Sequence, residues 1–238
     1  MTSLQKALEF STKQKSPSDR AIIEDKFAVY YFTQGKLEGA KVQWLNALSD
    51  GVAVSNLVLQ ADVLVALSAL QQANGHLDQA MKAVDQALDL SRKSKSLYIE
   101  SRVLGELSRL QLLVGKQADA RTSIEEALQI DRFNRYDWEP GHLLYLANLD
   151  VAESKTDKAI EVGTSARDLA VKNENYLVFI QASPFLGQGY VQTGRVDEGI
   201  RMMELSRKGI SEQSKPLFQF PDRYKPNRDA TLILRSHS

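Results

Sequence analysis

The stretch at residues 75–80, GHLDQA, decides the fold, because it occurs in five versions at an almost constant spacing along this chain of 238 residues. The versions are GKLEGA at 35–40, GHLDQA at 75–80, GKQADA at 115–120, SKTDKA at 154–159 and GRVDEG at 194–199. Their successive offsets are 40, 40, 39 and 40 residues. Glycine suits the left-handed conformation that ends a helix, and an acidic residue favours the start of the next one. We therefore predict a repeated helix–turn–helix unit.

Helical patterns flank each of these turns and keep the same spacing. A small residue lies twelve positions before the end of every turn, and a large apolar residue precedes it. These pairs are Phe27-Ala28, Leu67-Ser68, Leu107-Ser108, Leu146-Ala147 and Leu186-Gly187. The positions four and seven residues after each turn are Trp44 and Ala47, Val84 and Ala87, Ile124 and Ala127, Gly163 and Ala166, and Met203 and Ser206. The pattern predicts helix pairs that cross closely and bury one stripe of the second helix.

A helical hairpin with these features resembles the tetratricopeptide repeat. The resemblance covers roughly residues 20–212 in five copies, with approximate bounds of 20–52, 56–92, 97–132, 137–172 and 176–212. Tyr31 and Tyr190 occupy the family's aromatic position near the end of the first helix, whereas Gln71, Gln111 and Asp150 depart from it. The family's usual repeat is about 34 residues long, so this chain resembles its extended class. The resemblance implies an all-α fold, a right-handed superhelical solenoid of antiparallel helix pairs.

Both ends of the chain depart from the repeat. Aligned on the same spacing, residues 1–16 match the second helix of a repeat whose first half is absent, so they are either a capping half-repeat or part of a longer array. Three prolines, at positions 216, 221 and 226, exclude a helical hairpin in residues 214–238. We expect the array to stop near Gln213 and a non-helical tail to follow. That tail is either a linker or an extended segment that docks on the helices, since it contains several large apolar residues.

Composition excludes several classes of function. Lys and Arg total 30 and Asp and Glu total 30, so no net charge attracts nucleic acid or an anionic membrane. The chain has no cysteine, which excludes disulfides and thiolate metal sites. Lys6 and Glu9 interrupt the apolar residues of the N-terminus, so we expect no signal peptide. The longest nearly uncharged stretch, residues 51–74, has the spacing of a packed helix, and we expect a cytoplasmic protein without a membrane span.

The sequence offers no catalytic, metal or cofactor site. His76, His142 and His237 have no metal-ligand spacing, and neither a phosphate-binding glycine loop nor a nucleophile motif is present. His76 follows a turn, where we expect it to be solvated. His142 follows Pro140 at an expected helix start, where it either caps the helix or faces a groove. We therefore expect a protein that is not an enzyme.

The resemblance implies that the first helix of each repeat lines a concave groove. Carrying the family's groove positions onto this sequence gives a mixture of polar and apolar side chains. The residues expected to bind a protein or peptide are Asp62, Gln72, Arg102, Arg109, Leu112, Asn148, Gln181, Gln188 and Gln192. Beside them lie Val65, Ala69, Gly105, Leu144, Val151 and Pro184.

Two arginines in this set carry the most specific chemistry. Arg102 and Arg109 lie seven residues apart, so both guanidinium groups project from one face of a helix. They either grip a carboxylate or phosphate of a ligand, or form ordinary salt bridges, for instance to Glu106. Asn148 could bond the main chain of a bound peptide. Pro184 is expected to kink the first helix of the fifth repeat.

The function these features favour is a protein- or peptide-binding scaffold, because repeat arrays expose large grooves rather than catalytic pockets. The alternative is the ligand- or peptide-sensing domain of a bacterial transcriptional or signalling regulator. An adjoining nucleotide-binding or helix-turn-helix domain in the same gene would favour the alternative. We expect no nucleic acid and no membrane as partner, and the sequence leaves the partner's identity and the oligomeric state open.

Overall fold

A computed structural model of the chain describes residues 6, 9 and 16–213, with the backbone alone for 207–213. The described part contains ten helices and no strand. They are α2 (Pro17–Thr33), α3 (Leu37–Ala53), α4 (Leu57–Ala73), α5 (Leu77–Ser94), α6 (Leu97–Leu113), α7 (Gln117–Asn134), α8 (Glu139–Ala152), α9 (Thr156–Lys172), α10 (Tyr176–Gln192) and α11 (Val196–Gln213). The all-α expectation is confirmed. The capping half-repeat expected at 1–16 and the tail expected at 214–238 lie outside the described residues, apart from residues 6, 9 and 16.

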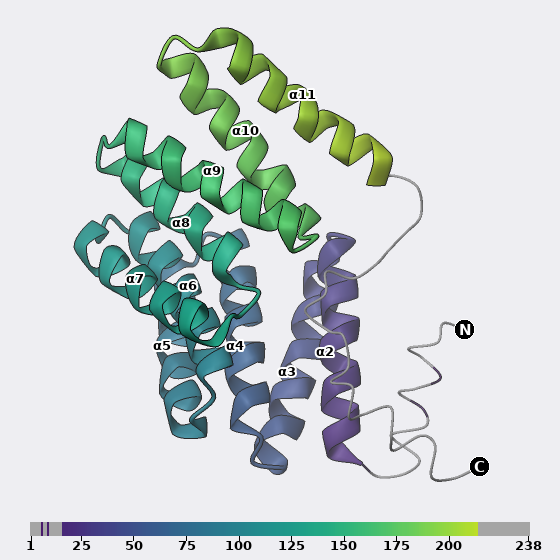
Figure 1. Cartoon of the computed structure of the whole chain (residues 1–238). Helices are drawn as coiled ribbons and strands as arrows, with labels where there is room; N and C mark the ends of the chain where they lie inside the picture. Colours follow the sequence, from purple (N-terminus) through teal and green to yellow (C-terminus); the bar gives the residue numbers. More distant parts are fainter. Residues whose placement is uncertain (1–5, 7–8, 10–15, 214–238) are drawn as a thin grey trace. The chain divides into compact units, whose positions relative to one another are not determined.

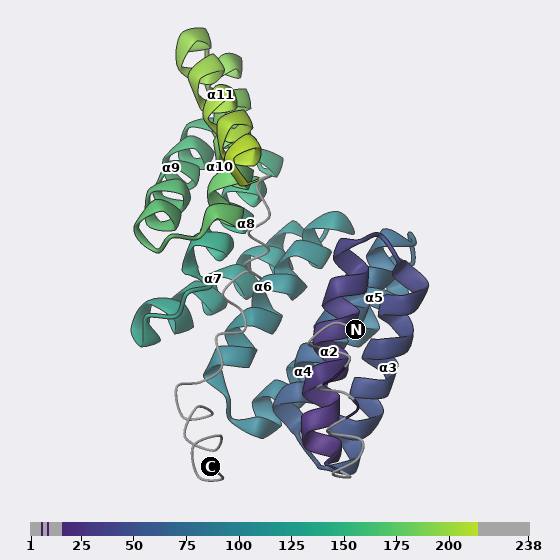
Figure 2. The same ribbon diagram turned by 90° about the vertical axis from the view of Figure 1, so that its right-hand side faces the viewer.

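The chain forms two compact units, residues 1–153 and residues 154–238. Unit 1 contains α2 to α8, and unit 2 contains α9, α10 and α11 (Figure 1). The boundary falls between the two helices of the expected fourth repeat. Within unit 1, α2 packs on α3, α4 on α5 and α6 on α7, and Figure 2 shows α2, α3 and α4 side by side. Within unit 2, α10 packs on both α9 and α11.

The turns have the backbone conformation that the repeated stretch predicts. Gly35, Gly75, Gly115 and Gly194 all have φ between 69° and 82°. Ser154 takes the glycine position in the fourth turn and adopts the same left-handed region, with φ at 61°. Each of these turns ends the first helix of a pair, and backbone bonds such as His76 N–H to Gln71 C=O, 2.8 Å long, close it. Glycine tolerates this conformation without a steric cost, which explains its recurrence.

The small residues lie where helices of a pair cross. Ala28, Ser68 and Ser108 are at most 2% exposed, and the hydroxyl of Ser108 donates to the carbonyl of Ala120 on the partner helix at 2.8 Å. On the second helices, Trp44, Val84 and Ile124 and the alanines that follow them are buried as expected. Met203 is 42% exposed, so the predicted buried stripe is wrong at that position. The reason is that α10 alone among the described helices packs extensively on α11.

Proline is accommodated inside α10, which runs without interruption from Tyr176 to Gln192. Pro184 has no N–H, so the carbonyl of Ile180 loses its usual helical partner. The hydroxyl of Ser206 on α11 donates to that carbonyl at 3.2 Å. Ser206, the small residue in the second helix of the fifth pair, therefore donates a hydrogen bond to the carbonyl that the proline leaves without a helical partner.

Candidate binding surface

The predicted surface residues of unit 1 lie on the first helices α4, α6 and α8. Asp62 on α4 and Arg102 on α6 form an ion pair, and their side chains are only 17% and 11% exposed. The guanidinium of Arg102 also lies 5.5 Å from the ring centre of Trp138, just before α8. Arg102 is therefore held between a carboxylate and an indole.

A second polar cluster connects α4 and α6 nearer to the C-terminal ends of these helices. Arg109 donates to both carboxylate oxygens of Glu106, at 2.5 and 3.0 Å, and to the side-chain oxygen of Gln72 on α4 at 2.5 Å. The amide of Gln72 reaches Glu106 at 3.4 Å. Burial lowers the pKa of Arg109, but the bond to Glu106, the charge of Glu106 and the nearby phenol of Tyr145 raise it above its ordinary value. Tyr145 lies on α8, so three neighbouring first helices share this cluster.

The structure adds Lys26 on α2 to the surface. Its amine lies 3.1 Å from the carboxylate of Asp25, and its side chain is 21% exposed. Burial lowers the pKa of Lys26, Asp25 opposes that shift, and the positive charge of Arg102 adds to it. Sequence reasoning missed Lys26, Trp138 and Tyr145, because their positions in the repeat were not among the family's groove positions.

The remaining predicted residues belong to α6, α8 and α10. Leu112 is half-buried at the end of α6, and Asn148 is exposed on α8, where its amide donates to the carbonyl of Leu144 in its own helix at 2.7 Å. Gln181, Gln188 and Gln192 are exposed on α10 of unit 2. Each of these glutamines is open to solvent, as a binding residue must be.

His142 was expected to cap a helix or to face the groove, and both expectations are wrong. Its ring is 4% exposed, and Nδ1 lies 2.6 Å from the carboxylate of Asp131, which also accepts a bond from the hydroxyl of Ser101. A Cβ at Gly105 would lie 2.1 Å from Nε2 of His142, so the glycine makes room for the imidazole. Gly105 therefore faces the interior. The buried side chains of Ser101, Asp131 and His142 thus connect α6, α7 and α8.

Two further properties of the described residues bear on function. Residues 6, 9 and 16–213 include no helix long and apolar enough to cross a membrane. The same part of the chain holds no group of three His, Asp or Glu side chains arranged to hold a metal ion.

Comparison with known proteins identifies the fold. No protein-family model and no curated protein matches the sequence. Among solved structures, BtubC (BKLC) from P. vanneervenii shares 15% identity at a TM-score of 0.66, with 95% of both chains covered. A Rap protein complexed with competence and sporulation factor gives a TM-score of 0.72 at 15% identity over 84% of this chain and 55% of that chain. A putative kinesin light chain from Podosopora anserina, with nearly identical TPR-like repeats, gives 0.58 at 17% identity over 84% and 98%.

The fold is that of the tetratricopeptide-like repeat proteins. Identities this low establish the shared architecture alone.

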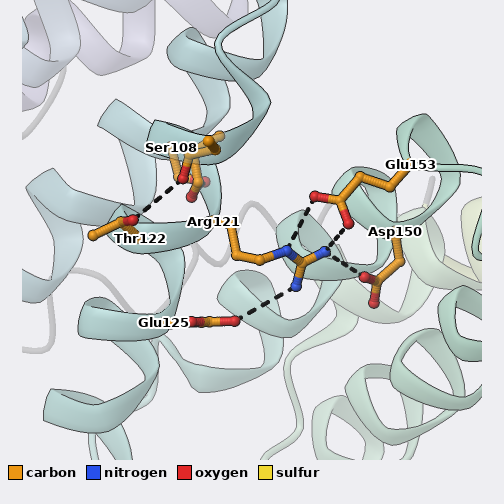
Figure 3. Close-up of polar contacts among 8 residues, drawn as sticks. Ser108, Arg121, Thr122, Glu125, Asp150 and Glu153 are labelled. Carbon is orange, nitrogen blue, oxygen red and sulfur yellow. Dashed lines mark hydrogen bonds and ion pairs between the residues drawn. The ribbon is translucent and has the colours of Figure 1, made fainter.

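Within this tetratricopeptide-like fold, the departure at Asp150 has a structural compensation. Asp150 is fully buried at the position where Tyr31 and Tyr190 stand in other helix pairs. Arg121 on α7 reaches its carboxylate at 2.5 Å and that of Glu153 at 2.7 and 3.0 Å, with Glu125 at 3.5 Å (Figure 3). The hydrogen bond to Glu153 is the main cause that raises the pKa of Arg121. A charged cluster thus links α7 to α8 where an aromatic ring packs elsewhere.

Proposed function

We propose that the chain is a non-enzymatic scaffold that binds a protein or peptide on the surface formed by α2, α4, α6 and α8 of unit 1. The observation that carries this proposal is the row of partly buried polar side chains, Asp62, Arg102, Gln72, Glu106 and Arg109, shared between neighbouring first helices. Charged groups held in fixed geometry at a partly desolvated surface give specificity for a matching ligand. A net charge of zero supports a protein partner over nucleic acid, and we expect the protein to act in the cytoplasm.

The ion pairs define how an acidic ligand group binds. Arg102 and Arg109 already face Asp62 and Glu106, so a ligand carboxylate must share or replace these partners. Arg109 is 30% exposed and keeps donors for a second acceptor, whereas Arg102 at 11% is nearly covered. The ligand therefore makes its first polar contact at Arg109, with Gln72 beside it.

The test begins with the full chain as bait to recover its partner, followed by calorimetric titration of the purified partner. Replacing both arginines, Arg102→Ala with Arg109→Ala, should weaken binding by roughly tenfold or more and leave the helical spectrum unchanged. The matched control is Arg92→Ala with Arg132→Ala. These arginines also form ion pairs, but they lie on the second helices α5 and α7 with side chains 51% and 58% exposed. Equal affinities for the two double variants would exclude the proposed surface.

The second candidate is a peptide-sensing domain of a bacterial regulator. The observation that favours it is the similarity to a Rap protein whose structure contains a bound competence and sporulation factor. This function predicts that binding of a peptide changes the dimensions of the whole chain, which small-angle scattering measures as a change in radius of gyration. A scaffold keeps the same radius when the peptide binds.

A further inference from the structure

A charged residue replaces leucine in the second unit at a position that is apolar in the first. This position follows the regularly spaced alanine of the second helix in each pair. It holds Leu48, Leu88 and Leu128 in the first three pairs and Arg167 in the fourth. Leu128 is 2% exposed, and Leu48 and Leu88 pack against the apolar clusters of unit 1. Arg167 thus places a guanidinium where the repeat normally buries a hydrocarbon side chain.

The N–H groups of Arg167 donate to a single oxygen of an exposed carboxylate and to a thioether sulfur. Nε and Nη2 both reach one oxygen of Asp168, the next residue, at 2.9 and 2.6 Å. Nη1 lies 3.2 Å from the sulfur of Met202 on α11, and a thioether is a weak acceptor. The Arg167 side chain is 21% exposed, whereas that of Asp168 is 61% exposed and screened by water. A planar guanidinium prefers two oxygens of one carboxylate, and among the described side chains no carboxylate supplies both.

Arg167 lines a hollow of about 470 Å³ within unit 2, formed by α9, α10 and α11, which lie side by side in Figures 1 and 2. Arg201 on α11 lines it as well, and the described side chains offer Arg201 no ion pair. Tyr190, 8% exposed, lines it with Met202 and Leu205, which add apolar surface. The volume falls within the range of small-ligand sites.

Two carboxylates, those of Glu198 and Glu204, also line the hollow. Arg195 donates to Glu198 at 2.5 and 3.0 Å, and this bond lowers the pKa of Glu198. Burial opposes the shift, and the positive charges of Arg195 and Arg201 add to it. Arg195 itself stacks on the ring of Tyr190 at 4.3 Å. Glu204 follows Arg201 by three residues on α11 and is exposed. Donors from two helices therefore face an apolar surface, which is the arrangement that holds an acid group next to a hydrocarbon group.

We propose that this hollow of unit 2 binds a carboxylate attached to an apolar body, with Arg167 and Arg201 on the carboxylate and Tyr190, Met202 and Leu205 on the hydrocarbon. The ligand is either a small organic acid or the C-terminal residue of a peptide, since both have this chemistry. The site consists of unit 2 residues alone, so its test does not depend on the surface proposed on unit 1.

The test uses the full chain with ¹³C-methyl methionine. Met202 reports on the hollow, and Met81 on α5 is the internal control. Titration with N-acetyl-leucine should shift the Met202 methyl signal saturably, and N-acetyl-leucinamide, which lacks the carboxylate, should not shift it. A tripeptide with a free C-terminal leucine distinguishes the two sources: tighter binding than that of N-acetyl-leucine indicates a peptide terminus, and equal or weaker binding indicates a small acid. The same tripeptide with an amidated C-terminus should not bind.

Two variants decide which residues bind. Arg201→Gln and Arg167→Leu should each weaken binding about tenfold, because each removes a charge-assisted hydrogen bond. Arg167→Leu restores the residue of the first three repeats, so the fold should tolerate it. Lys82→Gln on the exposed face of α5 is the charge-matched control and should bind like the unaltered chain. The proposal is overturned if acid and amide shift Met202 equally, if no shift occurs, or if both arginine variants retain full affinity.

Discussion

The carboxyl group of Glu24 on α2 is buried, and one of its oxygens has no hydrogen-bond partner among the residues that the structure describes. The residue is 7% exposed. Burial raises the pKa of Glu24 to about 7, the negative charge of Asp50 adds to the shift, and Arg20 opposes it. Arg20 opposes it only weakly, because both of its guanidinium contacts go to Asp50. Glu24 therefore titrates near neutral pH.

This titration predicts how stability depends on pH. The folded pKa lies above the ordinary value of 4.5, so the folded state binds the proton more tightly than the unfolded state. The stability contributed by this proton is complete below pH 4.5 and is lost as the pH rises through about 7. Glu24→Gln should remove this loss, since an amide does not titrate. Urea unfolding followed by tryptophan fluorescence at several pH values between 5 and 8 measures the difference.

The control for this prediction is Glu38→Gln, which changes the same charge at an exposed site on α3. It should keep the pH dependence of the unaltered chain. A pH-independent midpoint in the unaltered chain, or the same slope in Glu24→Gln, would contradict the assignment.

Single positions also show what the sequence could and could not predict. Glu24 occupies the repeat position that holds Leu64, Leu104 and Leu143 in later pairs, so the spacing alone marks it as a core position. The surroundings of its charge were not predictable, because Asp50 and Arg20 occupy positions that the repeat pattern leaves free. The same holds for His142, whose contacts with Asp131 and Gly105 depend on three helices meeting.

Helix pairs were predictable because the turn and the crossing recur with constant spacing. The same spacing also predicts contacts between equivalent positions of neighbouring repeats. Asp62 and Arg102 are 40 residues apart and occupy the same position in consecutive first helices, which lie next to each other in a repeat array. An acid and a base at equivalent positions of neighbouring repeats therefore predict an ion pair. From the sequence we allowed salt bridges for Arg102 and Arg109 but named Glu106 as the example and did not identify Asp62.

The crossing of α6 and α7 permits a direct test of the repeat alignment. Ser108 is 2% exposed, and its hydroxyl binds the partner helix at Ala120. Ser108→Trp should overpack this crossing and lower the free energy of unfolding by more than about 2 kcal/mol. Urea denaturation followed by circular dichroism measures the loss. Ser49→Trp, which adds the same ring at an exposed position on α3, should leave the midpoint nearly unchanged, and equal midpoints for both variants would refute the alignment.

The whole chain divides into two units of unequal core. Unit 1 contains one apolar cluster around Trp44 and Leu70 and another around Val84 and Val103. The described part of unit 2 contains a smaller apolar cluster of Ile160, Leu186 and Tyr190. Burial of apolar surface is the main favourable term in folding, so unit 2 should be the less stable of the two.

This difference predicts two unfolding transitions that different probes separate. Both tryptophans of the chain, Trp44 and Trp138, belong to unit 1, so tryptophan fluorescence reports on that unit alone. Circular dichroism reports on the helices of both units. As urea increases, circular dichroism should begin to fall at a lower concentration than fluorescence, because α9, α10 and α11 unfold first. A fragment of residues 1–153 should keep the fluorescence transition of the whole chain and lose the early change in circular dichroism. Coincident curves for the two probes in the whole chain would instead show that the units unfold as one cooperative structure, with contacts between neighbouring helices outweighing the difference in their cores.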